Sequence, residues 1–151
     1  MVKNMALSLE KPTGEWFNAL PKTEYVYRLI DATHAGTERT ERLLAVESLG
    51  KSDDPRAVKP LMDLEADGDA DIRMAATLGL GRLRSGRSVD VLISRLIDAN
   101  ETPEIRKNAV VALASIRSIG AVHGLREFIA DETGDMSLRT FARETMERSH
   151  N

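Results

Sequence analysis

Apolar residues return every three or four positions through most of the chain, and charged residues fill the positions between them. The clearest stretch is 72–83, where the apolar positions are Ile72, Ala75, Ala76, Leu80 and Leu83. This spacing is typical of a helix with one buried side, whereas a half-buried strand would alternate apolar and polar residues. The stretch therefore predicts an amphipathic helix.

This helical pattern repeats with a period of 31 to 33 residues. Four arginines and four alanines occupy equivalent positions of the repeat: Arg42, Arg73, Arg106 and Arg139, and Ala45, Ala76, Ala109 and Ala142. A second apolar pattern follows in the same frame, with valine at 58, 89 and 122 and leucine at 61, 92 and 125. Two helices per repeat, stacked on their neighbours, would bury one continuous core.

Capping residues mark where both helices of the repeat begin. The residues before the first helices are Asp69, Thr102 and Asp135, and those before the second helices are Asp54, Ser85 and Ser118. Each offers a side-chain oxygen to a backbone N–H that the helix leaves unpaired, which stabilises a helix start by about 1 kcal/mol. These residues predict the helix starts.

The repeat pattern Ile-Arg-x-x-Ala-Ala…Leu-x-Gly…Leu, with Asp-Pro-Arg-Ala-Val-x-x-Leu at 54–61, resembles the HEAT-like repeat of the phycobilisome-lyase type. We therefore expect an all-α protein, a short right-handed α-solenoid (superhelix) of about three and a half HEAT-like helical hairpins with an N-terminal helical cap. The expected parts are a flexible arm at 1–14, the helical cap at 15–36 and the repeat domain at 37–148, with repeats at about 37–68, 69–101 and 102–134 and a half repeat at 135–148.

The resemblance also implies a structural role for the arginine column. In that family pattern the arginines pair with an aspartate column, here Asp67, Asp98 and Asp131, and so tie successive repeats together. The alternative is a row of arginines that binds phosphates or nucleic acid. We favour the ladder because an aspartate column lies close in sequence and because the protein is acidic, with a net charge of −3.

Composition narrows the class of protein further. The 151 residues contain no cysteine, which excludes disulfides and thiolate metal sites. Apolar runs fall far short of the roughly 18 residues that a membrane span needs, so we expect no membrane partner and a cytoplasmic protein. The acidic balance makes a nucleic-acid partner unlikely on charge grounds.

No constellation of residues indicates catalysis. One enzyme class with HEAT-like repeats binds iron through paired His-Glu ligands, but none of His34, His123 and His150 is followed by Glu. A phosphate-binding Gly-x-x-x-x-Gly-Lys-Ser/Thr loop is absent, and no serine stands in a nucleophile-elbow sequence. We therefore expect no enzyme activity, no cofactor and no metal.

The second helices are expected to line an inner, concave surface that binds a partner. Their solvent-facing positions are Lys59, Asp63, Asp90, Val91, Ser94, His123 and Glu127. Polar columns beside a shallow apolar strip suit a protein or peptide better than a small molecule.

Two aromatic residues near the N-terminus, Trp16 and Phe17, belong either to the helical cap or to an exposed anchor for a partner.

Four arginines gather at the turns within repeats: Arg82, Arg84, Arg87 and Arg117. We favour a structural interpretation, because arginines at helix C-termini interact favourably with the helix dipole. The alternative is that they bind an acidic protein, a nucleotide or a phosphate backbone.

Together these patterns predict a protein-interaction module, an adaptor or scaffold whose partner is unidentified. The alternatives are a bilin-lyase-like or chaperone-type accessory protein and, less favoured, nucleic-acid binding; end repeats could also stack into a homo-oligomer.

Overall fold

The computed structural model describes residues 22–151, and in this part of the chain all regular structure is helical. The helices are α2 (Lys22–Ala32), α3 (Arg39–Gly50), α4 (Val58–Leu64), α5 (Ala70–Leu83), α6 (Val89–Ile97), α7 (Pro103–Ile116), α8 (Ile119–Ala130) and α9 (Met136–His150). Short 3-10 turns, η1 (Pro55–Ala57) and η2 (Gly86–Ser88), lead into α4 and α6. The expected all-α solenoid is confirmed. The expected arm and the pair Trp16 and Phe17 lie outside the described residues.

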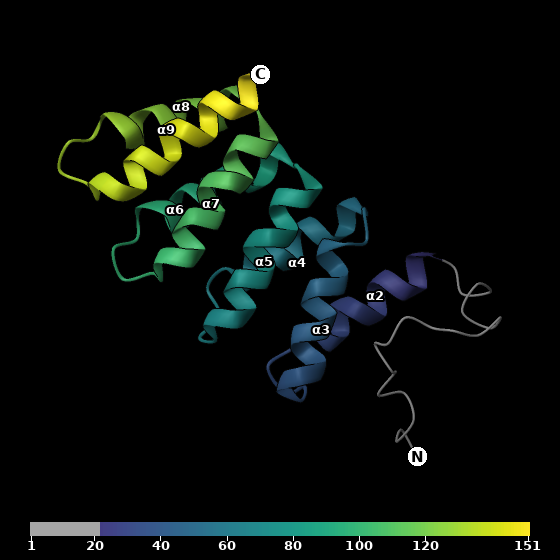
Figure 1. Ribbon diagram of the computed structural model, residues 1–151. Coiled ribbons are helices and arrows are strands. Elements are labelled where there is room, and N and C mark those ends of the chain that lie inside the picture. The colour runs from purple at the N-terminus through teal and green to yellow at the C-terminus, as the bar shows by residue number, and fades with distance from the viewer. Residues whose placement is uncertain (1–21) are drawn as a thin grey trace, which may run out of the picture.

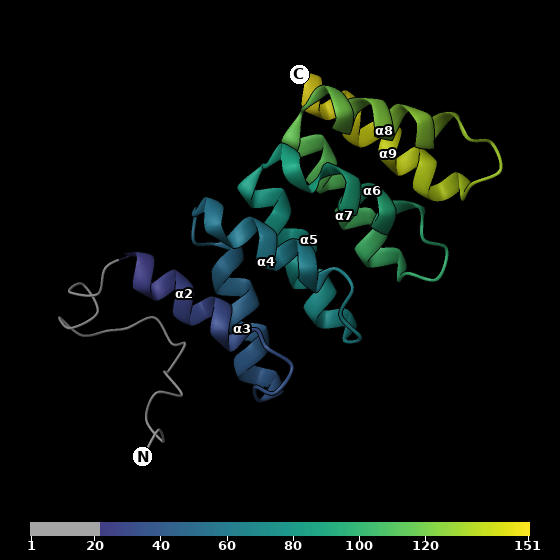
Figure 2. The same ribbon diagram turned by 180° about the vertical axis from the view of Figure 1, so that it is seen from behind.

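The helices form two layers, one from each helix of the repeat. The first helices, α3, α5, α7 and α9, pack side by side in chain order (Figure 1). The second helices, α4, α6 and α8, form the layer behind them, which faces the viewer in Figure 2. At the N-terminal end α2 packs on α3 and η1. Each second helix also packs on the first helix of the next repeat, so successive hairpins share one core.

The predicted capping residues begin the helices as expected. All six accept a hydrogen bond from a backbone N–H two or three residues ahead: Asp54, Asp69, Ser85, Thr102, Ser118 and Asp135. Asp54 and Ser85 cap the 3-10 turns that precede α4 and α6, not the α-helices themselves. The turns between first and second helices also repeat, because Asp53, Arg84 and Arg117 all adopt a left-handed conformation with φ of 52°, 49° and 55°.

The arginine column joins neighbouring repeats, but mostly not through the expected aspartates. Arg42 pairs with Asp67, whereas Arg73 pairs with Glu101, at 2.8 and 2.9 Å. Arg106 and Arg139 donate to the carbonyl oxygens of Leu96 and Ile129, at 2.8 and 2.9 Å. Asp98 and Asp131 are instead used in their own loops.

All four column arginines share one contact with the preceding helix. Each donates to a backbone carbonyl in the last turn of that helix or within three residues after it. The acceptors are the oxygens of Thr33, Asp67, Leu96 and Ile129. Terminal carbonyls have no partner within their own helix and carry partial negative charge, so a guanidinium satisfies them. The ladder therefore ties repeats through helix ends, and the expected Arg–Asp pairing holds only at Arg42 and Asp67.

The first helices approach one another more closely than the second helices do. A Cβ added to Gly50 on α3 would lie 2.6 Å from the Cα of Gly79 on α5, and one added to Gly81 would lie 3.1 Å from the Cα of Ala112 on α7. In the other layer, α4 reaches η2 and makes little direct contact with α6. A stack of helical hairpins curves toward the layer whose helices lie closer together. We therefore call the exposed side of α3, α5, α7 and α9 the inner face. This differs from the expectation that the second helices line the inner surface.

Candidate partner-binding surface

The seven residues predicted to bind a partner lie on the second-helix layer. They are Lys59 and Asp63 on α4, Asp90, Val91 and Ser94 on α6, and His123 and Glu127 on α8. Lys59 pairs with Asp63 one turn ahead, and His123 Nε2 lies 3.2 Å from Glu127 Oε1 in the same arrangement. Within residues 22–151, no ion pair or side-chain hydrogen bond joins these positions across helices. Partner binding by this set stays a prediction.

Two apolar side chains are exposed at equivalent positions in the middle of the inner face. Leu78 on α5 is 41% exposed and Val111 on α7 is 42% exposed. The same position holds Glu47 on α3 and Glu144 on α9, and both face solvent. The repeat columns did not single out this pair, although glutamates at the equivalent positions indicate that the position faces water. Exposed apolar side chains here are candidate contacts for a partner.

The larger groove of the inner face lies between α5 and α7 and has a volume of about 540 Å³. Its apolar part is formed by Leu78, Leu83, Val111 and Ala112, and Asn108 and Ser115 add polar groups. Gly81 is also part of the lining, and the absence of a side chain there lets α7 come close. The groove thus combines an apolar surface with hydrogen-bonding groups on α7.

A smaller groove of about 280 Å³ lies on the other side of Leu78, between α3 and α5. Leu43, Met74 and Ala75 contribute its apolar surface. Leu78 and Arg82 line both grooves, so the two form one continuous surface across three helices. Shallow apolar grooves of this kind suit side chains of a protein or peptide better than an enclosed small molecule.

Basic residues border both grooves where the first helices end. Arg82 lies in the last turn of α5, Arg84 in the turn after it, and Lys51 directly after α3. Lys51 lines the smaller groove and Arg84 the larger one. In the described chain none of these three side chains has an ion-pair partner. We call Lys51, Arg82 and Arg84 the basic margin.

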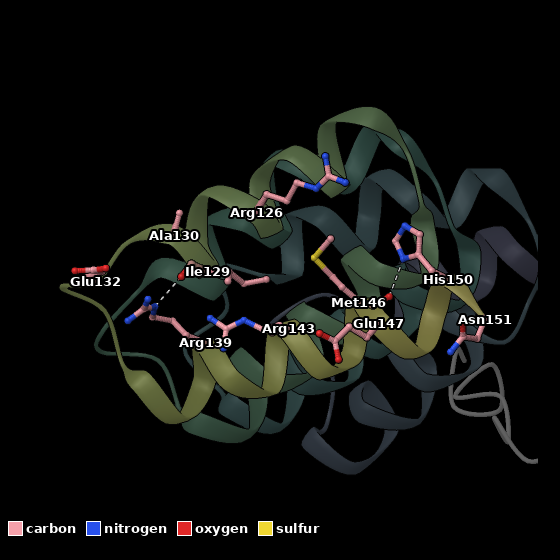
Figure 3. Close-up of a pocket in the computed structure, with 10 residues that line it drawn as sticks. All are labelled: Arg126, Ile129, Ala130, Glu132, Arg139, Arg143, Met146, Glu147, His150 and Asn151. Carbon is pink, nitrogen blue, oxygen red and sulfur yellow. Dashed lines mark hydrogen bonds between the residues drawn. The ribbon is translucent and has the colours of Figure 1, made fainter.

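Another groove, of about 880 Å³, lies between α8 and α9 (Figure 3). Figure 3 shows Arg139 and Arg143 side by side on α9 and Met146 pointing into the space between the helices. Arg143 stands where the preceding first helices have buried Val46, Thr77 and Val110. An exposed arginine in place of these buried side chains leaves this side of α9 open to solvent in the structure.

A buried charged network lies where α4, α5 and α6 meet. Glu101 accepts hydrogen bonds from Arg73 and from Arg95 Nη1, each with a shortest distance of 2.8 Å. The Arg73 guanidinium holds the pKa of Glu101 down to about 2. Glu65, 1% exposed, accepts a hydrogen bond from Thr77, and burial raises its pKa to about 7. Because Glu65 is enclosed by the core, we assign this network to the packing of the repeats.

Between residues 22 and 151, no group of three or more His, Cys, Asp or Glu side chains is arranged to hold a metal ion. In the same part of the chain, no helix has the length and apolar character that a membrane crossing requires. The cytoplasmic location stays a prediction.

Comparison with known proteins identifies the repeat. The family model described as HEAT repeats matches residues 26–102 and 64–144. A search of curated proteins gave no match. Human deoxyhypusine hydroxylase is among the solved structures that match, with 22% identity and a TM-score of 0.71 over 83% of this chain. The match spans 43% of deoxyhypusine hydroxylase, less than half of its length.

The structural match corrects one expectation, that the chain is not an enzyme. Deoxyhypusine hydroxylase is an enzyme, and its fold is similar to that of this chain. A repeat fold that supports catalysis in one protein gives no ground for excluding it in another. At 22% identity the similarity extends to the fold alone.

Proposed function

This chain belongs to the HEAT-repeat family, and we propose that it acts as a scaffold that binds another protein or a peptide on its inner face. The observation that carries the proposal is the exposed pair Leu78 and Val111 beside two apolar grooves. Burying apolar surface of this kind against a partner is favourable by about 25 cal/mol per Å² before the costs of association.

The packing of the first helices supports a preformed surface. Contacts such as those between Gly50 and Gly79 and between Gly81 and Ala112 leave little room for α3, α5 and α7 to shift against one another. A rigid surface loses little conformational entropy when a partner binds. The inner face is therefore better suited to binding than a loop surface of the same area.

Affinity capture from the native cell extract tests the proposal by comparing two matched double variants. Leu78→Glu/Val111→Glu changes the inner face to the residue that α3 and α9 already carry at this position, Glu47 and Glu144. Asp90→Arg/Ser94→Arg changes the exposed side of α6. Circular dichroism and thermal melting check that both variants fold.

The proposal expects partners that are captured by wild type and by the α6 variant and are lost from the inner-face variant. Partners lost only from the α6 variant would contradict it. That result would favour the sequence-based prediction, in which the seven second-helix residues bind the partner. Capture that neither variant changes would contradict both surfaces.

The resemblance of the repeat to the phycobilisome-lyase type supports bilin attachment or a chaperone role as an alternative. It rests on the repeat pattern at 54–61 and 72–83 and on no particular side chain of the described surface. Incubation of the protein with a bilin tests it through absorbance and fluorescence. Without a spectral shift or transfer to an acceptor protein, this alternative fails.

A further inference from the structure

Within residues 22–151 the basic margin of the inner face lacks internal counter-ions, unlike five other arginines of the repeat domain. Arg39, Arg42, Arg56, Arg73 and Arg95 all form ion pairs with nearby carboxylates. The side chains of Lys51, Arg82 and Arg84 form none within residues 22–151. Three cations at the ends of two apolar grooves thus stand free for a ligand's negative charge.

The carboxylates that share the grooves do not neutralise this margin. Asp71, in the smaller groove, is already bound to Arg39 Nη2 at 2.5 Å. Glu47 lines the same groove and Asp53 the larger one, but neither lies within ion-pair distance of a basic side chain of residues 22–151. The margin therefore keeps an excess of positive charge over the carboxylates beside it.

We propose that the inner face binds a peptide segment whose apolar side chains enter the two grooves and whose carboxylates lie against Lys51, Arg82 and Arg84. This inference rests on the proposed function and adds the chemistry of the partner. Packed helices lie roughly 8–10 Å apart, so neighbouring grooves have about that spacing. A polyproline-II chain rises about 3.1 Å per residue with three residues per turn, so two apolar residues three apart would project to the same side and reach both grooves.

The apolar grooves favour a peptide over a nucleic acid as the source of the negative charge. A phosphate backbone would contact Arg82 and Arg84 but would leave the surface around Leu78 and Val111 uncovered. A peptide with adjacent apolar and acidic residues uses both features. Carboxylates at the rim of such an interface mainly set specificity and association rate, and apolar anchors supply most of the affinity.

Selection of peptides from a random 12-residue phage-display library on the immobilised full chain tests the inference. Wild type is compared with Arg82→Glu/Arg84→Glu at the margin and with Leu78→Gln in the grooves. Arg126→Glu/Arg143→Glu is the matched control, because it makes the same charge change at exposed arginines of α8 and α9. Binding of the enriched peptides to each variant is then measured by fluorescence anisotropy.

The inference expects wild type to enrich peptides that combine apolar residues with Asp or Glu. Their affinity should fall by about tenfold or more in the margin variant and in Leu78→Gln, and should stay within about twofold in the control. Peptides that need Leu78 but carry no acidic residues would overturn the inference and leave the proposed function standing. Enriched peptides that bind Leu78→Gln as well as wild type would contradict both.

Discussion

The Thr77 hydroxyl donates a hydrogen bond to Glu65 Oε1 over 3.0 Å in the protein interior, where both residues are shielded from solvent. Burial raises the pKa of Glu65 from 4.5 to about 7 in the folded protein. Its neutral form therefore stabilises the fold fully below pH 4.5, and this stabilisation is lost as the pH rises through 7. We predict a fall of about 3 kcal/mol in the free energy of unfolding across this interval.

Replacement of Glu65 by Gln removes the ionisation and keeps the side-chain shape. The variant should lose the part of the pH dependence between pH 5 and 8 that comes from this carboxyl, as measured by urea unfolding at several pH values. Glu144→Gln on the exposed side of α9 is the control and should retain the wild-type profile. A profile for Glu65→Gln identical to that of wild type would contradict the raised pKa.

Glu101 joins Arg73 of α5 to Arg95 of α6, and its own side chain is fully buried. Glu101→Gln would leave the partly buried Arg73 guanidinium without its ion-pair partner and Arg95 with only Asp98, at 3.7 Å, so we predict a loss of about 3 kcal/mol in unfolding free energy. In wild type this stabilisation is present above pH 4.5 and is lost as the pH falls toward the folded-state pKa of about 2.

Acid unfolding of wild type and Glu101→Gln followed by circular dichroism checks the role of Glu101. The difference in stability between the two proteins should shrink as the pH falls from 5 to 2. A constant difference over this range would show that Glu101 stabilises by packing and not by charge.

Gly79 lies where α3 and α5 cross, with Gly50 of α3 directly opposite. A Cβ at Gly79 would lie 2.8 Å from the Cα of Gly50 and 3.0 Å from Leu61 Cδ1, so Gly79→Ala must push two helix backbones apart. We predict a loss of about 1–3 kcal/mol, the usual cost of overpacking, despite the higher helix propensity of alanine. Gly36→Ala, with no atom within 4 Å of the added Cβ, is the control. Equal melting temperatures for the two variants would contradict the close contact.

The repeat and the helix starts could be predicted from the sequence because local chemistry determines them. Thr102 and Ser118 accept backbone N–H groups whatever the wider packing, and the column of apolar residues defines the buried side of each helix. Glu101 could not be found in this way because it lies in a loop between repeats, outside the columns that mark the helices. Its partners Arg73 and Arg95 come together only when two hairpins stack.

The direction in which the stack of hairpins curves was the main feature that the repeat columns of the sequence could not predict. Periodicity shows which side of a helix is exposed, but curvature depends on the relative spacing of the two helix rows. The small residues at Gly50, Gly79, Gly81 and Ala112 carry that information, because they allow the first helices to approach each other closely. Without it, the columns predict that the exposed side of the second helices is the inner surface, and they do not single out Leu78.

The most direct test of partner binding on the inner face is site-specific photo-crosslinking in the native cell extract. A benzoylphenylalanine probe is placed at Leu78 on the inner face or at Ser94 on the second-helix layer, both solvent-exposed. Our account predicts a discrete crosslinked partner from position 78 and no more than background from position 94. A discrete partner from position 94 alone would contradict it.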